Sequence, residues 1–335
     1  MRNVRQNGQI TMDNWIKILT VNPIKSLLSS RDDILTHYVE RDLLDKTNDK
    51  NIYNKEIDLI IKRQQSNGSW IFRSSSVKKY PSINHNLVET FKSIRILVGK
   101  YEMDKSFDVI SKCADYIFDC QTSEGDFRGI LGNQYMPYYC GLFVEYLIRA
   151  GYEDDERITQ AMNWLISSKQ NDGGWVVPLQ TVKINKLDDQ TYASDPIIAD
   201  KSLPFSHLAT GMVLRAFAVH SGFQKCDVTI KAAELIKSRF FKSDNYNDRK
   251  SPGYWTKFQY PYWWTTLLSS LDSLYDIGFT IKDRDIEKCI EWLLINQDDS
   301  GLWTTAYDKG DKDKLELNRL WIGYNICKIL KLYLN

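Results

Sequence analysis

The sequence predicts an all-α fold of stacked helical hairpins, and three observations support this prediction. A short run of Gln, polar residues with Gly, and an aromatic residue recurs as RQQSNGSW at 63–70, CQTSEGDF at 120–127, KQNDGGW at 169–175 and NQDDSGLW at 296–303. An apolar pattern of helical period precedes each copy, and a second helical pattern follows it. No pattern of strand-like alternation competes with these helices.

The recurring stretch has the chemistry of a helix end. Its glycines supply the open or left-handed backbone that stops a helix. The Gln amide can bond backbone groups freed at that end, and the aromatic ring can fold back over the turn. Copies recur about every 50 residues, and a single hairpin cannot bury its own apolar face, so the hairpins should stack. We pair Gln65 with Trp70, Gln121 with Phe127, Gln170 with Trp175, and Gln297 with Trp303.

The first half of the chain predicts three hairpins. The first joins a helix at 12–28, which Pro23 interrupts, to a helix at 31–45. Ser30 is suited to cap this second helix, and the acidic residues that follow it favour a first helical turn. The next two hairpins pair 53–65 with 83–98 and 105–120 with 136–150.

The second half predicts three more hairpins. The first helix of each later pair mixes charged and apolar residues, as at 281–290, which is typical of an outer helix with one wet face. The second helix is apolar on more sides, as at 208–217, which is typical of an inner helix. Gly141 and Gly211 are expected to let inner helices approach closely. These pairs are 155–169 with 204–221, 226–241 with 261–277, and 283–296 with 315–334.

Two irregularities interrupt the repeat. The gap between Gln170 and Gln297 leaves room for one further copy, and Phe240-Phe241 stands where that helix should stop. Residues 176–203 form a long polar connector, whereas the equivalent connector at 128–135 is short. Long loops in compact proteins are often functional, so we expect this one at the rim where inner helices begin.

The four repeats resemble the QW motifs of the terpene-cyclase and protein-prenyltransferase β-subunit superfamily. More closely, the chain resembles short prokaryotic prenyltransferase/squalene-oxidase-repeat proteins, over nearly its whole length. The resemblance implies an (α/α)6 barrel, a toroid of six helical hairpins that forms a single domain over residues 1–335. It also implies a terpenoid cyclase- or prenyltransferase-like enzyme acting on an apolar isoprenoid-type ligand in the central cavity. The alternative is a non-catalytic barrel that keeps the fold and binds a ligand or a protein.

Composition excludes some classes of function. The net charge of +1 gives no electrostatic reason to expect nucleic acid as a partner. The opening residues lack the apolar segment of a signal peptide, and no apolar run of about 18 residues would span a bilayer. The six cysteines form no Cys-x-x-Cys pair, so we expect free thiols in the cytoplasm. Peripheral contact of the protein with a membrane is still possible, because isoprenoid substrates partition into membranes.

An aromatic lining is the first candidate site. In a ring of this type, the first turns of the inner helices face one mouth of the cavity. Aromatic faces there would stabilise a carbocation. The expected lining is Tyr138, Tyr139, Tyr262, Trp263, Trp264, Trp321 and Arg319.

The acid that such cyclases need has no clear source in this sequence. Related cyclases supply it from the middle Asp of Asp-x-Asp-Asp, a motif that this chain lacks. The nearest acidic groups are Asp188, Asp189 and Asp195 in the long connector. Repulsion between neighbouring carboxylates raises the pKa of one of them, so these three are the candidate catalytic acids. Solvated surface acids are the simpler reading.

A metal centre is the second candidate. The related prenyltransferases bind zinc through Asp-x-Cys and a His, and the Asp-x-Cys is absent here. However, His85, Cys140 and His207 fall near the starts of three consecutive inner helices. Imidazole and thiolate suit Zn, with Asp189, Asp195 or water as a fourth ligand. A buried structural Cys and hydrogen-bonded histidines are the alternative. Such transferases also need a helical partner subunit, which this sequence does not identify.

Overall fold

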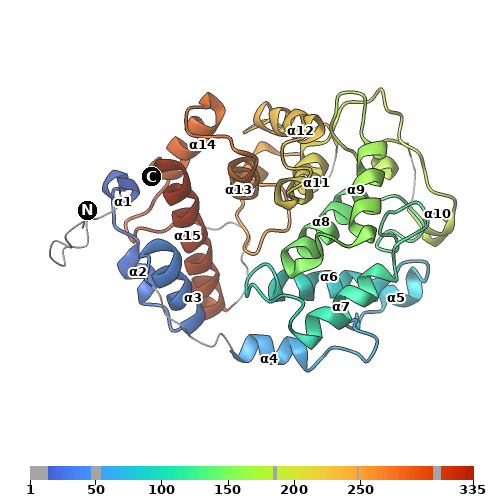
Figure 1. Ribbon diagram of the computed structural model, residues 1–335, viewed down its shortest axis with the longest axis horizontal. Helices are drawn as coiled ribbons and strands as arrows, with labels where there is room; N and C mark the ends of the chain where they lie inside the picture. Colours follow the sequence, from blue (N-terminus) through green and yellow to red (C-terminus); the bar gives the residue numbers. More distant parts are fainter. Residues whose placement is uncertain (1–13, 47–53, 184–186, 247–248, 305–310) are drawn as a thin grey trace, which may run out of the picture.

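The computed structural model describes residues 14–46, 54–183, 187–246, 249–304 and 311–335. Across these residues the regular elements are helices, and β-type pairing is limited to isolated bridges, such as Gln64 with Trp70 and Gln121 with Phe127. The helices are arranged as paired layers around a centre, in a ring that Figure 1 shows from one side. The predicted all-α toroid of helical hairpins is therefore confirmed.

The outer layer holds the first helix of each hairpin. These helices bury one face: in α9 the buried residues include Ile158, Ala161 and Leu165, at helical spacing. The outer helices are α1 (Asn14–Ile18), α2 (Ile24–Leu28), α4 (Lys55–Ile61), α7 (Asp108–Phe118), α9 (Glu156–Ser168), α12 (Asp227–Lys237) and α14 (Arg284–Ile295).

The inner layer holds the second helix of each hairpin. Every residue of α8 is buried, as are those of α11 up to Ala218, because these helices touch neighbours on all sides. The inner helices are α3 (Asp33–Tyr38), which continues as a π-helix at Val39–Leu43, α6 (His85–Leu97), α8 (Pro137–Leu147), α11 (His207–Val219), α13 (Leu267–Ile277) and α15 (Lys312–Leu334).

Neighbouring inner helices pack side by side around the ring. Helix α8 contacts α6 and α11, α11 contacts α13, and α13 contacts α15, which in turn contacts the first hairpin. A Cβ atom on Gly141 would lie 2.8 Å from the Cα of Val213, and one on Gly211 would overlap the side chain of Thr265. The expectation that these glycines permit close approach is met.

The motif tryptophans share one contact. The indole Nε1 of Trp70, Trp175 and Trp303 donates a hydrogen bond of 2.7–2.8 Å to a carbonyl ten residues earlier in each case. Each ring is almost fully buried. The predicted fold-back of the aromatic ring over the helix end is present, with a polar bond that anchors it.

The motif glutamines join one hairpin to the next. The amide of Gln121 donates to the carbonyl oxygens of Gly125 at 2.8 Å, within its own turn, and of Arg157 at 2.7 Å, on the following outer helix. Gln297 closes the ring in the same way, since its amide donates to Val21 O at 2.8 Å. In both cases the glutamine side chain links its own motif turn to the neighbouring hairpin of the ring.

The assignment of Gln65 to the first motif is wrong by one residue. Its neighbour Gln64 makes the two motif bonds, to Gly68 O at 3.0 Å and to Val109 O at 2.8 Å. Gln65 donates only to the nearby Arg63 O. The reason is geometric: the motif glutamine stands four residues before the turn glycine whose carbonyl it binds, and Gln64 has that spacing to Gly68.

The long connector and the missing copy both modify this pattern. The amide of Gln170 donates to Asp200 O and Leu203 O, so the end of the connector replaces the usual outer helix. The connector contains a short helix, α10 (Asp189–Ala193). At the missing copy, Trp255 takes the aromatic role, with its Nε1 donating to Lys242 O at 3.0 Å.

The centre of the ring is filled by the chain itself. Residues 258–264, which we call the central segment, precede α13 and run into the ring between α6, α8 and α15 (Figure 1). Three consecutive carbonyls of this segment are bound by inner-helix side chains: Pro261 O by Arg95, Tyr262 O by Tyr146 and Arg215, and Trp263 O by Arg215. These bonds satisfy a buried backbone that has no helix or sheet of its own.

Other sequence expectations have simple outcomes. All six cysteines are free thiols. No helix in the described parts of the chain combines the length and the apolar character that a membrane-spanning segment requires. One cluster of buried apolar residues extends from Trp15 to Tyr333, so the first and last hairpins share a core.

Candidate functional site

A cavity of about 360 Å³ lies between the second halves of the inner helices, on one side of the central segment. This position differs from the expected one at the first turns of these helices. Its walls come from α8, α11, α13, α15, the end of α6 and the central segment. The polar lining residues are Glu102, Glu145, Tyr146, Arg149, Arg215, Tyr260, Tyr262, Asp272, Asn325 and Lys328.

A buried ion pair is part of the lining of this cavity. Arg215 Nη2 lies 2.7 Å from Glu145 Oε2, and both side chains are less than 4% exposed. Arg149 adds a second guanidinium, with Nε 3.1 Å from Glu145 Oε1 and Nη2 3.7 Å from Asp272 Oδ2. A buried pair of this kind is a poor source of net stability, because desolvation offsets most of the attraction. It does provide fixed charges of both signs inside a protected space.

The cavity is close to electrically balanced. Its lining holds the acids Glu102, Glu145 and Asp272 and the bases Arg149, Arg215 and Lys328. The bases lie toward the carboxyl ends of inner helices, where the helix dipole favours positive charge. One turn beyond Asp272 on α13, burial and the Asp272 charge raise the pKa of Asp276 to about 6. Asp276 itself is not among the residues that line the cavity.

The expected aromatic residues do gather in the ring, but they pack on one another. Trp263 stacks on Trp264 at 5.3 Å, and Tyr138 contacts both Tyr139 and Trp264. Trp321 stacks on Tyr260 at 5.7 Å and is buried, as are Tyr138, Tyr139 and Tyr262. These rings form core around the central segment.

Cations of the chain itself lie over three of these rings. The guanidinium carbon of Arg249 lies 3.4 Å from the ring centroid of Trp264, and that of Arg95 lies 5.0 Å from Trp263. Lys100 Nζ lies 4.8 Å from the ring of Trp321. The three tryptophan rings thus already have a positive charge of the protein over a face that could otherwise attract a carbocation.

The three candidate acids lie on the surface of the connector. Asp188 caps α10, with its carboxylate accepting from Thr191 N at 3.0 Å. Asp189 accepts hydrogen bonds of 2.9 Å from the backbone and hydroxyl of Ser82, which fastens the connector beside α6. Asp195 is exposed, and the amide of Gln134 holds its backbone carbonyl. None of the three lines the cavity between the inner helices.

The three expected zinc ligands are not brought together. His85 stacks on Phe72 and contacts Tyr80 O through Nε2, and Cys140 is fully buried, which raises the pKa of its thiol. His207 packs against Trp255. In the described ranges no group of three or more His, Cys, Asp or Glu side chains is arranged to hold a metal ion. These residues therefore do not support the Zn site suggested by their positions.

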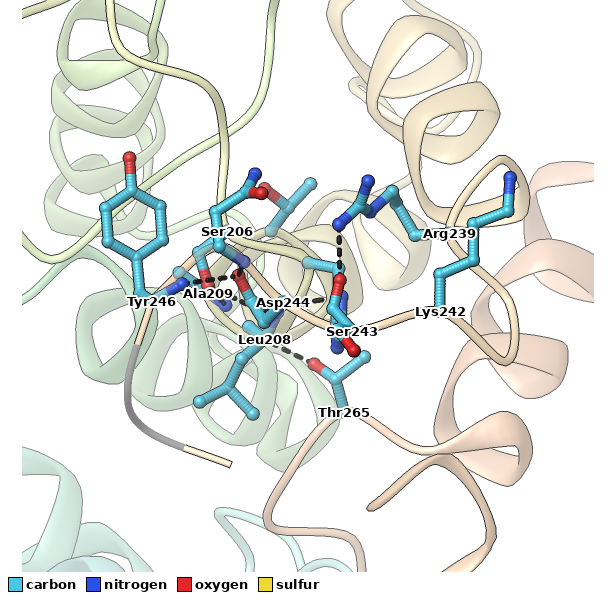
Figure 2. Close-up of polar contacts among 12 residues, drawn as sticks. Ser206, Leu208, Ala209, Arg239, Lys242, Ser243, Asp244, Tyr246 and Thr265 are labelled. Carbon is cyan, nitrogen blue, oxygen red and sulfur yellow. Dashed lines mark hydrogen bonds and ion pairs between the residues drawn. The ribbon is translucent and has the colours of Figure 1, made fainter. Parts of the chain in front are cut away.

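The carboxylate of Asp244 lies beside His207 at the start of α11. Its buried carboxylate accepts hydrogen bonds of 2.9 Å from Ser206 Oγ and Leu208 N at the start of α11, as Figure 2 shows. His207 Nδ1 lies 3.6 Å from the same carboxylate, and burial lowers the pKa of this imidazole. The arrangement is a helix cap supplied by a neighbouring segment.

Arg319, which was expected in the cavity lining, instead connects two parts of the fold. Its guanidinium forms an ion pair with Asp298 and donates to Ser300 Oγ at 2.7 Å, so it fastens the last motif turn to α15. Of the predicted lining residues, Tyr262 does line this cavity, whereas its charged lining residues were not predicted. One signal was present: Glu145 and Arg215 are lone charges within otherwise apolar inner helices. Such charges are rarely buried unless they are paired.

Searches for a matching family model and for a similar curated protein each found no match. Among solved structures, a protein from Actinoplanes matches with 14% identity and a TM-score of 0.45, over 96% of this chain and 90% of that one. A variant of the type II terpene cyclase MstE from Scytonema, bound to geranylgeranyl dihydroxybenzoate, matches with 11% identity and a TM-score of 0.32, over 82% of this chain and 94% of that one. The apo form of MstE matches with 12% identity and a TM-score of 0.29, over 82% and 95% of the two chains. At these identities and TM-scores the likeness assigns no activity to this chain.

Proposed function

We propose that this chain is a binding protein that holds a small polar molecule, neutral overall, between the second halves of its inner helices. The observation that carries the proposal is the cavity of about 360 Å³ with fixed charges of both signs. This volume falls within the range typical of small-molecule sites. A ligand with one positive and one negative group would find a partner for each.

The geometry of the cavity supports a zwitterionic or neutral polar ligand over a strongly charged one. Arg149 and Arg215 already share Glu145, so an added anion would compete with an existing carboxylate. Lys328 and Asp272, which are both partly exposed, line the cavity from two different helices. The hydroxyl of Tyr146 and the amide of Asn325 add neutral hydrogen-bonding groups, although both also bind neighbours within the protein.

The resemblance favours the other reading, a terpenoid cyclase or prenyltransferase with an apolar isoprenoid ligand. Two observations weigh against it here. The central segment occupies the middle of the ring, and the aromatic faces in that region carry Arg and Lys of the protein itself. We also propose a cytoplasmic location, in which free thiols such as these persist.

The test is mass spectrometry of small molecules released from protein purified from its native host. We expect a polar compound from the wild type and from a control with the exposed Lys288→Ala change on α14. The compound should be lost from Asp272→Ala and from Lys328→Ala, which alter the cavity wall without removing the buried pair. Recovery of a polyprenyl compound instead, or equal recovery of a polar compound from all four proteins, would refute the proposal.

A further inference from the structure

A second, smaller cavity lies on the other side of the central segment. It measures about 250 Å³, and Tyr260 and Pro261 line both this cavity and the larger one. Its charged lining residues are Glu56, Arg95, Lys100 and Lys314. The two cavities are therefore separate sites with a shared wall.

Arg95 carries a buried charge without a counterion. The residue is 8% exposed, and among the described residues no carboxylate lies within ion-pair distance of its guanidinium. It donates to Pro261 O and lies over Trp263, but its buried Nε has no hydrogen-bond partner. A buried ionised group without a partner is costly, so such groups are usually paired.

The charges around this smaller cavity do not cancel. Glu56 is already bound to Lys100, with 2.7 Å between Oε2 and Nζ, and it also accepts from Tyr101. Although burial raises the pKa of Glu56, the charges of Lys100 and Lys314 and the hydrogen bonds hold it below its usual value, so the carboxyl is ionised. With Glu56 and Lys100 paired, Arg95 and Lys314 supply about two positive charges toward the cavity.

We propose that this smaller cavity binds a small oxyanion of the phosphate class, through Arg95 and Lys314. A dianion matches the two uncompensated cations, and guanidinium binds such oxygens with strong charge-assisted hydrogen bonds. Gln259 favours an oxyanion that also carries a hydrogen-bond donor. This residue lines the same cavity, and its buried Oε1 has no hydrogen-bond partner. Hydrogenphosphate offers acceptor oxygens for the cations and a hydroxyl donor for this amide oxygen, whereas sulfate offers no donor.

The experiment is calorimetric titration with inorganic phosphate at constant ionic strength, with sulfate as the second probe. We expect saturable binding of phosphate by the wild type and weaker binding of sulfate. Arg95→Met should weaken phosphate binding about ten- to a hundredfold, the factor for loss of one hydrogen bond to a charged group. Lys314→Ala should weaken it less, and since this side chain is exposed the variant keeps its fold.

Two controls complete the design. Lys312→Ala removes an exposed positive charge two residues away on α15, and Lys328→Ala alters the larger cavity; both should bind phosphate as the wild type does. Equal affinity of wild type, Arg95→Met and Lys314→Ala would show adventitious association only and overturn the assignment. Because Lys328 belongs to the other site, loss of its polar ligand and loss of phosphate binding are separable results.

Discussion

The adjacent residues Gln64 and Gln65 offer a sharp test of how the hairpins are joined. Gln64 Nε2 donates to Gly68 O and Val109 O, within its own turn and at the start of α7. Gln65 Nε2 donates only to Arg63 O, two residues away. A net contribution of about 0.5–1.5 kcal/mol for each hydrogen bond gives roughly 1–3 kcal/mol for Gln64→Ala. Gln65→Ala should stay within about 0.5 kcal/mol of the wild type, as most surface changes do.

The assay is urea unfolding followed by circular dichroism, with the two variants measured against the wild type. Both changes remove the same side chain from neighbouring positions, so differences in composition cancel. The midpoint should fall for Gln64→Ala, with an unchanged slope, and hardly move for Gln65→Ala. Equal losses in the two variants, or the larger loss at Gln65, would refute the role given to the motif glutamine.

Three further outcomes follow from the packing and charges. Gly211→Ala should lower the free energy of unfolding by about 1–3 kcal/mol in the same assay, because the added Cβ overlaps Thr265. Gly222→Ala is the control, since a Cβ there meets only His220, at 3.5 Å. Trp303→Phe should cost about 1 kcal/mol or more, since Leu293 O loses its donor; a neutral result would contradict the anchoring bond. Asp276 has a folded pKa of about 6 against an unfolded value of about 3.9, so its ionisation should remove up to about 3 kcal/mol of stability as pH rises from 4 to 7. The Asp276→Asn variant should lack this loss, and parallel pH profiles of variant and wild type would contradict it.

The helix pairs were predictable because each one is encoded locally. In four of the hairpins, apolar residues at helical spacing, a turn glycine and a motif aromatic lie close together in sequence, and the helical spacing alone indicates the other two. The error at Gln65 arose where two glutamines stand side by side and only the position of the turn glycine distinguishes them. The four-residue spacing to the turn glycine identifies Gln64 as the motif glutamine once the Gly68 carbonyl is known to be its partner.

The site was not predictable in the same way. The sequence predicts Tyr262, Trp263 and Trp264 as part of a cavity wall, but these residues belong to the central segment, which enters the ring, and only Tyr262 of the three lines the larger cavity. Whether a ring is hollow depends on contacts between residues such as Arg95 and Pro261, which are 166 positions apart. No local pattern reports such a contact. A lone charge within an apolar helix, such as Arg215, is the local signal that indicates a buried, paired charge.

The bond between Gln297 and Val21 has a consequence for how the protein matures on the ribosome. The two residues are 276 positions apart, and Trp321 reaches Asp32 over 289 positions. The first hairpin, which includes the buried residues Trp15 and Leu27, can therefore pack against its final partner only after nearly the entire chain has been synthesised. Contacts so distant in sequence form slowly, and apolar surface left uncovered meanwhile invites aggregation. Nascent chains halted before α15 should consequently be the species that chaperones retain.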